Sequence, residues 1–173
     1  LVVAAGNGER DVSLDESIVS TSAGGAHQGA ALNLALSRGL RPTLYLGELS
    51  NLLAGNIQIV HHVTGSSRTF KGEEICGVSA LENAVLRIGA GQGELFLVGG
   101  ALNAERWDLL LNYELGCNLW HHPFRPVWQR QQAGGGFVPG SMGAFLVLES
   151  RAHAQARGAR PYARIAGIAS DRS

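Results

Sequence analysis

The chain has 173 residues, enough for one ordinary domain with a buried core. Its 14 basic residues balance 14 acidic ones and only 16% of all residues are charged, so no net field favours nucleic acid or an anionic membrane. No apolar run is long enough to cross a bilayer, and the two cysteines are too few for a disulfide framework and lack the paired spacing of zinc ligands. We therefore predict a cytoplasmic protein with no nucleic-acid partner and no membrane span. We also expect neither a metal nor a cofactor.

The chain opens with the apolar residues 1–5, which predict a buried strand ended by a glycine turn. Because this start lies inside a core strand and has no initiator methionine, we expect a piece of a longer protein. Helix signals follow at residues 13–16 and again at residues 30–36. The small and polar residues 20–29 between them predict a loop.

Apolar residues recur in threes and fours over residues 42–59, which predicts an amphipathic helix that begins after Pro42 and ends near Gly55. Residues 61–71 are polar and rich in glycine and serine, so we expect a loop. The apolar spacing of residues 78–88 then marks a second helix with one buried face, closed by glycines.

The second half of the chain is rich in short apolar runs. Residues 94–98 predict a central buried strand, and a helix-like pattern covers residues 103–115. Residues 120–128 hold several aromatic and proline residues and predict irregular structure. The glycine-dense residues 134–143 predict a loop that leads into a strand at residues 144–148.

The last expected elements are a helix over residues 150–157 and a strand over residues 162–168. Strands and helices alternate along the whole chain. That order predicts an α/β protein with a largely parallel sheet covered by helices on both faces.

Three stretches, at residues 51–57, 77–101 and 136–149, together resemble the β-ketoacyl-acyl carrier protein synthases of the thiolase superfamily, in the ketoacyl synthase II-like branch. Their order and separations match that family along most of the chain. The resemblance implies a thiolase-like layered α/β fold of two similar halves and a dimeric enzyme. It further implies that residues 1–173 are a partial ketoacyl synthase domain, covering the later part of the first half and the start of the second.

The family's chemistry is a decarboxylating Claisen condensation on an acyl carrier protein, and it uses a cysteine at a helix N-terminus. The helix dipole favours the thiolate, and backbone N–H groups hold the developing oxyanion. Aligning Gly77 with the glycine of the family pattern Cys-x-x-Gly puts Glu74 at the nucleophile position. A carboxylate is a poor acyl acceptor, but it can cap the free N–H groups of a helix start.

Cys76 lies close to the same helix start and is the alternative nucleophile, with a buried packing thiol as the plainer interpretation. Three functions stay open. The first is a non-condensing partner of an active synthase in fatty acid biosynthesis. The second is an active 3-oxoacyl-acyl carrier protein synthase, and the third is a non-enzymatic binding module on the same scaffold. The sequence Gly-Glu-Glu at positions 72–74 also resembles that of homologues that serve lipid A very-long-chain acyl synthesis.

The resemblance implies an acyl carrier protein as partner, with a homodimer or a heterodimer that includes an active ketoacyl synthase. The catalytic histidines of the family would lie beyond this chain. Substrate-binding positions carried over from the family are Gly77, Phe137, Gly140 and Gly143. For docking of an acidic carrier protein, the candidate surface cations are Arg106, Arg125 and Arg130.

Overall fold

The computed structural model describes residues 1–6, 8, 11–22, 28–39, 46–47, 49–72 and 75–170, and of residues 21, 22 and 28 the backbone alone. The chain divides into two compact units, which we describe separately. Unit 1 comprises Leu1–Gly8, Leu46–Ala101 and Gly143–Ser173, and unit 2 comprises Glu9–Tyr45 and Leu102–Met142. Among the described helices, none combines the length and the apolar character needed to cross a bilayer.

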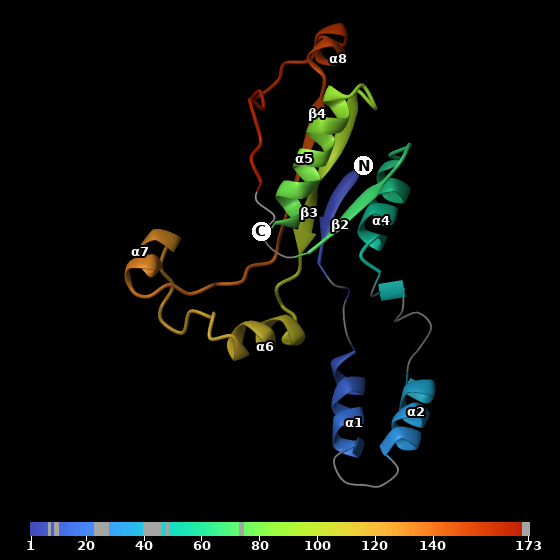
Figure 1. The fold of residues 1–173 in the computed structure, drawn as a ribbon, viewed down its shortest axis with the longest axis vertical. Coiled ribbons are helices and arrows are strands. Elements are labelled where there is room, and N and C mark those ends of the chain that lie inside the picture. Colours follow the sequence, from blue (N-terminus) through green and yellow to red (C-terminus); the bar gives the residue numbers. More distant parts are fainter. Residues whose placement is uncertain are drawn as a thin grey trace. The chain divides into compact units, whose positions relative to one another are not determined.

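Within the described residues, unit 1 is built on a four-stranded sheet in the order β2-β1-β3-β4 (Figure 1). The strands are β1 (Val2–Ala5), β2 (Arg68–Lys71), β3 (Leu95–Leu102) and β4 (Met142–Glu149). β1 pairs in parallel with both β2 and β3, so that Val2 stands between Arg68 and Val98. β4 runs antiparallel to β3, because the amide of Ser150 after β4 donates to the carbonyl of Glu94 before β3, at 2.9 Å.

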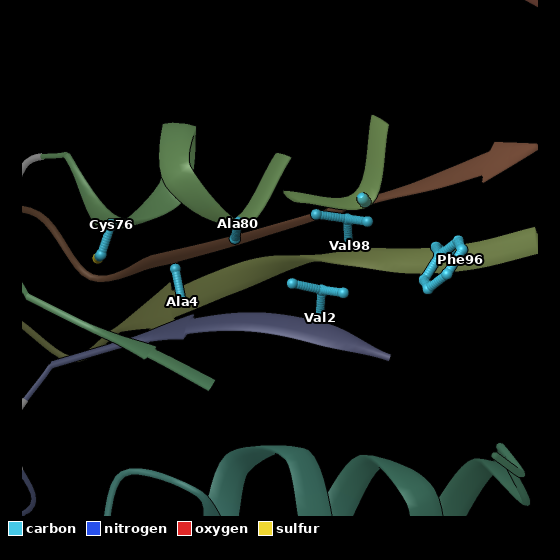
Figure 2. Packing of buried hydrophobic residues seen from close by; sticks show 7 residues of the cluster. Val2, Ala4, Cys76, Ala80, Phe96 and Val98 are labelled. Carbon is cyan, nitrogen blue, oxygen red and sulfur yellow. The ribbon is translucent and has the colours of Figure 1, made fainter. Parts of the chain in front are cut away.

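One face of this sheet is covered by α5 (Cys76–Gly89). Val2 and Ala4 of β1 point toward that helix and share a buried cluster with Ala80 and Ala84 (Figure 2). Both helix alanines are fully buried, and their spacing of four residues places them on one side of α5. Small side chains here let the helix backbone lie close to the sheet. The helix predicted over residues 78–88 is thus confirmed.

The opposite face is covered by α4 (Leu52–His61). Leu1 and Val3, which alternate with Val2 and Ala4 along β1, pack there against the buried Ala54. A strand flanked by helices on both sides has no solvent face, which explains why residues 1–5 are apolar without alternation. The predicted α/β fold with a largely parallel sheet covered on both faces is confirmed.

The helix predicted over residues 42–59 is wrong in its bounds. α4 begins at Leu52, runs through Gly55 and ends at His61, whose successor His62 adopts a left-handed conformation with φ of 53°. Glycine inside a helix costs about 1 kcal/mol relative to alanine, but burial of Ala54 against the sheet offsets that cost. Residues 42–45 and 48 of the predicted helix lie outside the described ranges.

Two strand predictions also need correction. The loop prediction for residues 61–71 is wrong at residues 68–71, which form β2. This segment becomes a strand by pairing with β1, which is far away in the sequence. Conversely, residues 162–168 form no strand, and Tyr162 is fully exposed. Their apolar pattern suits a strand, but they pair with no other strand in the described part of the chain, so their backbone groups gain no ladder hydrogen bonds.

In unit 2, α1 (Val12–Ser22) and α2 (Gln28–Gly39) pack against each other. The Asp11 carboxylate begins α1 by accepting a hydrogen bond from the Leu14 amide at 3.1 Å. Leu14 in turn packs over Gly39, where an added Cβ would collide with its methyl group. The predicted helix signals are confirmed. The loop expected over residues 20–29 is wrong at residues 20–22 and 28–29, which are helical, and residues 23–27 lie outside the described ranges.

The remainder of unit 2 holds α6 (Trp107–Leu115) and α7 (Val127–Gln132). α6 begins four residues later than the predicted start at residue 103, and α7 was not predicted because its six residues follow a proline-rich segment. Phe137, which follows α7, packs near the end of α6. Its ring lies 4.9 Å from that of Tyr113, and its amide donates to the Asn118 carbonyl at 2.7 Å.

The helix predicted over residues 150–157 is confirmed as α8 (Arg151–Ala156), with Ser150 Oγ accepting a hydrogen bond from the His153 amide at 3.1 Å. Glu149 precedes it at the end of β4. Its carboxylate accepts two hydrogen bonds from Arg157, at 2.8 and 2.6 Å, and lies 2.8 Å from His153 Nδ1. Hydrogen bonding by Arg157 first, and by His153 second, lowers the pKa of Glu149 from 4.5 to about 2.

A depressed carboxylate pKa stabilises the folded state above the unfolded pKa, and that contribution is lost as the pH falls through the folded pKa. We therefore expect Glu149→Gln to lower the melting temperature at pH 6, with the difference from the parent protein shrinking between pH 4.5 and about 2. Thermal melts of both proteins across this range make the measurement. Glu105→Gln, at an exposed carboxylate in unit 2, is the matched control, and an equal pH-dependent difference for this variant would contradict the assignment.

Candidate active site

The candidate site lies between the end of β2 and the start of α5. The Ser79 amide donates to the Ile75 carbonyl at 2.9 Å and closes the first turn of the helix. Ile75 is the N-cap residue, and its side chain makes no capping hydrogen bond because it is aliphatic. The first N–H groups of a helix carry partial positive charge and are left for another acceptor in such a case. Glu73 and Glu74, which precede Ile75 in the sequence, lie outside the described residues.

Cys76, the first residue of α5, is buried, with 9% of its surface exposed. Its thiol donates a hydrogen bond to the Gly72 carbonyl at 3.1 Å and belongs to the cluster that includes Ala4 and Ala80. Figure 2 shows the side chain on the side of α5 that faces the sheet. This environment fits the interpretation of Cys76 as a packing thiol under the helix, and a nucleophilic role for Cys76 stays a prediction.

The two cysteines of the chain allow a direct test of this burial. Cys117 is exposed, whereas Cys76 is buried. We expect N-ethylmaleimide to modify Cys117 at least about 100-fold faster than Cys76, since a buried thiol reacts only when the structure opens locally. Mass spectrometry of peptides over a time course gives both rates from one sample. Similar rates at the two positions would show that Cys76 is accessible.

The predicted substrate-binding residues fall in both units. Gly77 lies exposed in the first turn of α5, and nothing lies within 4 Å of the Cβ that a substitution would add there. Gly143 is the second residue of β4, and a Cβ there would lie 3.3 Å from that of Ala101. Phe137 and Gly140 belong to unit 2, where Phe137 is 42% exposed. A substrate role for these four positions stays a prediction.

The arginines expected on the surface behave differently from one another. Arg125 is exposed. The side chain of Arg106 is only 12% exposed and its Nε donates to Asp108 at 3.1 Å, a hydrogen bond that lowers the pKa of Asp108. Arg130 is 8% exposed, and its Nε and Nη1 have no hydrogen-bond partner among the described residues. The expectation of a surface contact is therefore wrong for Arg130.

Two further arginines, Arg68 and Arg87, were not predicted from the sequence as functional residues. They line a common cavity. They lie on β2 and α5, and the sequence contains no motif that links them. Pairing of β2 with β1 and packing of α5 on β1 bring them together. Only a prediction of which distant segments pack together could have identified these two arginines as lining one cavity.

The parallel core of the sheet, its antiparallel fourth strand and the helices on its two faces define an α/β protein. The chain belongs to the beta-ketoacyl synthase family, since the model for the beta-ketoacyl synthase N-terminal domain matches residues 3–154.

Two curated relatives agree with this assignment. The chain is 34% identical over 119 residues to a beta-ketoacyl synthase 2 assigned to the actinorhodin polyketide of Streptomyces coelicolor. The aligned region covers 67% of this chain and 29% of that protein. It is 28% identical over 134 residues to the 3-oxoacyl-[acyl-carrier-protein] synthase 2 of Rhizobium meliloti, with coverages of 75% and 32%. The chain thus spans about a third of the length of these relatives.

Among solved structures, the ishigamide ketosynthase/chain length factor is similar to this chain with a TM-score of 0.58 and 22% sequence identity. The match covers 92% of this chain and 36% of that chain. At this level of identity the likeness concerns the fold, and it places nearly the whole chain within the ketosynthase architecture.

Proposed function

We propose that the chain is part of a 3-oxoacyl-acyl carrier protein synthase homologue that has lost its nucleophile and works as a non-condensing partner in acyl-chain synthesis. The observation that carries the proposal is the residue at the nucleophile position. Glu74 stands three residues before Gly77, where the family pattern Cys-x-x-Gly has its cysteine. The nearest thiol, that of Cys76, is buried against the sheet.

A carboxylate at that position suits a structural or ligand-binding role better than acyl transfer. An acyl group on Glu74 would form an anhydride, which water hydrolyses readily, so no stable acyl-enzyme would accumulate. The aliphatic N-cap Ile75 makes no side-chain hydrogen bond to the start of α5. The helix N–H groups and the positive end of its dipole therefore favour a nearby anion, and the Glu74 carboxylate is the closest one in the sequence.

The proposed partners follow from the similar proteins. The Rhizobium meliloti relative is named for an acyl carrier protein substrate, and the ishigamide protein is a ketosynthase/chain length factor. We propose that this protein binds an acyl carrier protein and forms a homodimer or a heterodimer with an active synthase, in the cytoplasm. Within that assembly, residues 1–173 are part of one ketoacyl synthase domain.

A link to lipid A acyl chains belongs to the same proposal. It is supported by the sequence Gly-Glu-Glu at positions 72–74, which resembles homologues of that pathway. Fatty acid synthesis is the broader assignment, and the lipid A product is the narrower one. Comparing the acyl chains of lipid A in cells with and without the gene would separate them, since only the narrower assignment requires loss of the very long chains.

The experiment that tests the proposal incubates the complete protein with acyl carrier protein carrying a radiolabelled acyl chain. We expect no protein-bound label on a denaturing gel, and condensation with malonyl-acyl carrier protein only when an active synthase is added. Acylation mapped to Glu74 or Cys76 would overturn the loss of the nucleophile. Absence of any complex with the carrier protein or a synthase would favour a binding module without acyl chemistry.

A further inference from the structure

A cavity of about 550 Å³ lies in unit 1, between the segment that enters β2 and the last turns of α5. α5 has 14 residues and is therefore roughly 20 Å long, so this cavity lies at the opposite end of the helix from the candidate active site. The polar residues that line it are Ser66, Ser67, Arg68, Asn83, Arg87 and Gln92. None of its lining residues is acidic, so the two arginines leave the cavity positively charged.

Both arginines are held by aromatic rings. The guanidinium carbon of Arg87 lies 5.0 Å from the centroid of the Phe96 ring, and that of Arg68 lies 5.6 Å from the centroid of Phe70. A guanidinium within about 6 Å of a ring centroid is attracted to the ring, and its N–H groups can still donate to an anion. Arg87 Nη2 donates one hydrogen bond to Ser66 Oγ, at the long distance of 3.4 Å. The pair thus offers oriented donors.

The end of α5 does not oppose an anion as strongly as a free helix C-terminus would. Its last carbonyls already accept hydrogen bonds from the chain that follows: the Ala90 amide donates to Leu86 O at 2.9 Å and the Gln92 amide donates to Arg87 O at 2.9 Å. Satisfied carbonyls expose less negative charge to a ligand. The positive charge of the arginines therefore dominates the cavity.

Asn83 adds a group that requires a partner. Its Oδ1 is buried and has no hydrogen-bond partner among the described residues. A buried polar atom without a partner is costly, so a ligand or a water molecule is expected beside it. A phosphate that retains a hydroxyl could donate to this oxygen while its other oxygens accept from the arginines.

We propose that this cavity binds a phosphate group, held by Arg68 and Arg87 and positioned by Asn83 and Ser66. The site uses none of the residues around Glu74, so it stands whether or not this protein has lost its nucleophile. The phosphate would come either from free inorganic phosphate or from the phosphoryl group of a larger ligand, and the two sources share the same recognition chemistry.

Isothermal titration of the complete protein with inorganic phosphate, and separately with phenyl phosphate, tests the site. We expect saturable binding of at least one of them, weakened about 10-fold or more by Arg87→Gln, since each charge-assisted hydrogen bond contributes that much. Tighter binding of phenyl phosphate would assign the site to a phosphoryl group, and tighter binding of inorganic phosphate would assign it to the free ion.

Arg151→Gln is the matched control, because it removes an equal charge from an exposed position of α8 outside the cavity. We expect it to change phosphate affinity less than twofold. Arg68→Gln, at an exposed position of the sheet edge, gives a second variant if Arg87→Gln does not fold. The site is refuted by an absence of saturable binding, or by equal weakening in the cavity and control variants.

Discussion

Glu74→Cys in the complete protein is expected to create a stable acyl-enzyme on incubation with acyl-loaded carrier protein. The introduced thiolate would attack the carrier thioester, form a new thioester at position 74 and release the carrier thiol with its proton. The start of α5 would favour the thiolate through the helix dipole. Because removing a catalytic nucleophile can cost about 10⁶-fold, we expect labelling to rise on the order of 100-fold or more above the parent protein.

Two controls separate this result from chance labelling. Cys76→Ser should leave the labelling of the Glu74→Cys variant unchanged, since the Cys76 thiol is buried under α5. Glu74→Gln should remain unlabelled, because an amide is no better as an acyl acceptor than the carboxylate. Intact-protein mass spectrometry reads all variants. If Glu74→Cys folds, binds the carrier protein and still takes up no acyl group, position 74 is not the nucleophile position.

Gly99→Ala is expected to be strongly destabilising. A Cβ at Gly99 would lie 2.6 Å from the Cα atom of Phe145 and would also collide with the Ala144 carbonyl, both of which are backbone atoms of β4. Neither atom can move without separating β3 from β4. We expect a loss of about 3 kcal/mol in the free energy of unfolding, and a fall of about 6–12 °C in melting temperature.

Gly89→Ala provides the matched comparison. Gly89 is the last residue of α5, and nothing lies within 4 Å of the position of its added Cβ. Alanine favours helix over glycine, so this change should be neutral or stabilising by up to about 1 kcal/mol. Denaturant unfolding of both variants beside the parent protein gives the two values. Equal stability of Gly99→Ala and Gly89→Ala would mean that β3 and β4 do not approach as closely as described.

The local pattern of the sequence was sufficient where an element is long or fully buried. The apolar residues 1–5 and the one-sided apolar spacing of residues 78–88 each allow one structure, and both elements formed as predicted. Short elements behaved differently. β2 has four residues, α7 has six, and the pattern of residues 42–59 fits more than one helix register. In such segments the local preferences amount to too little free energy to select one structure.

The candidate site divides in the same way. The sequence puts Glu74 three positions before Gly77, and its resemblance to the ketoacyl synthases is what makes position 74 the predicted nucleophile position. Only the tertiary structure could decide that Cys76 is buried beneath α5, that Arg130 is withdrawn from solvent, and that Arg68 and Arg87 line the same cavity. Burial and proximity depend on which distant segments pack together, because packing removes side chains from water whatever their neighbours in the sequence are.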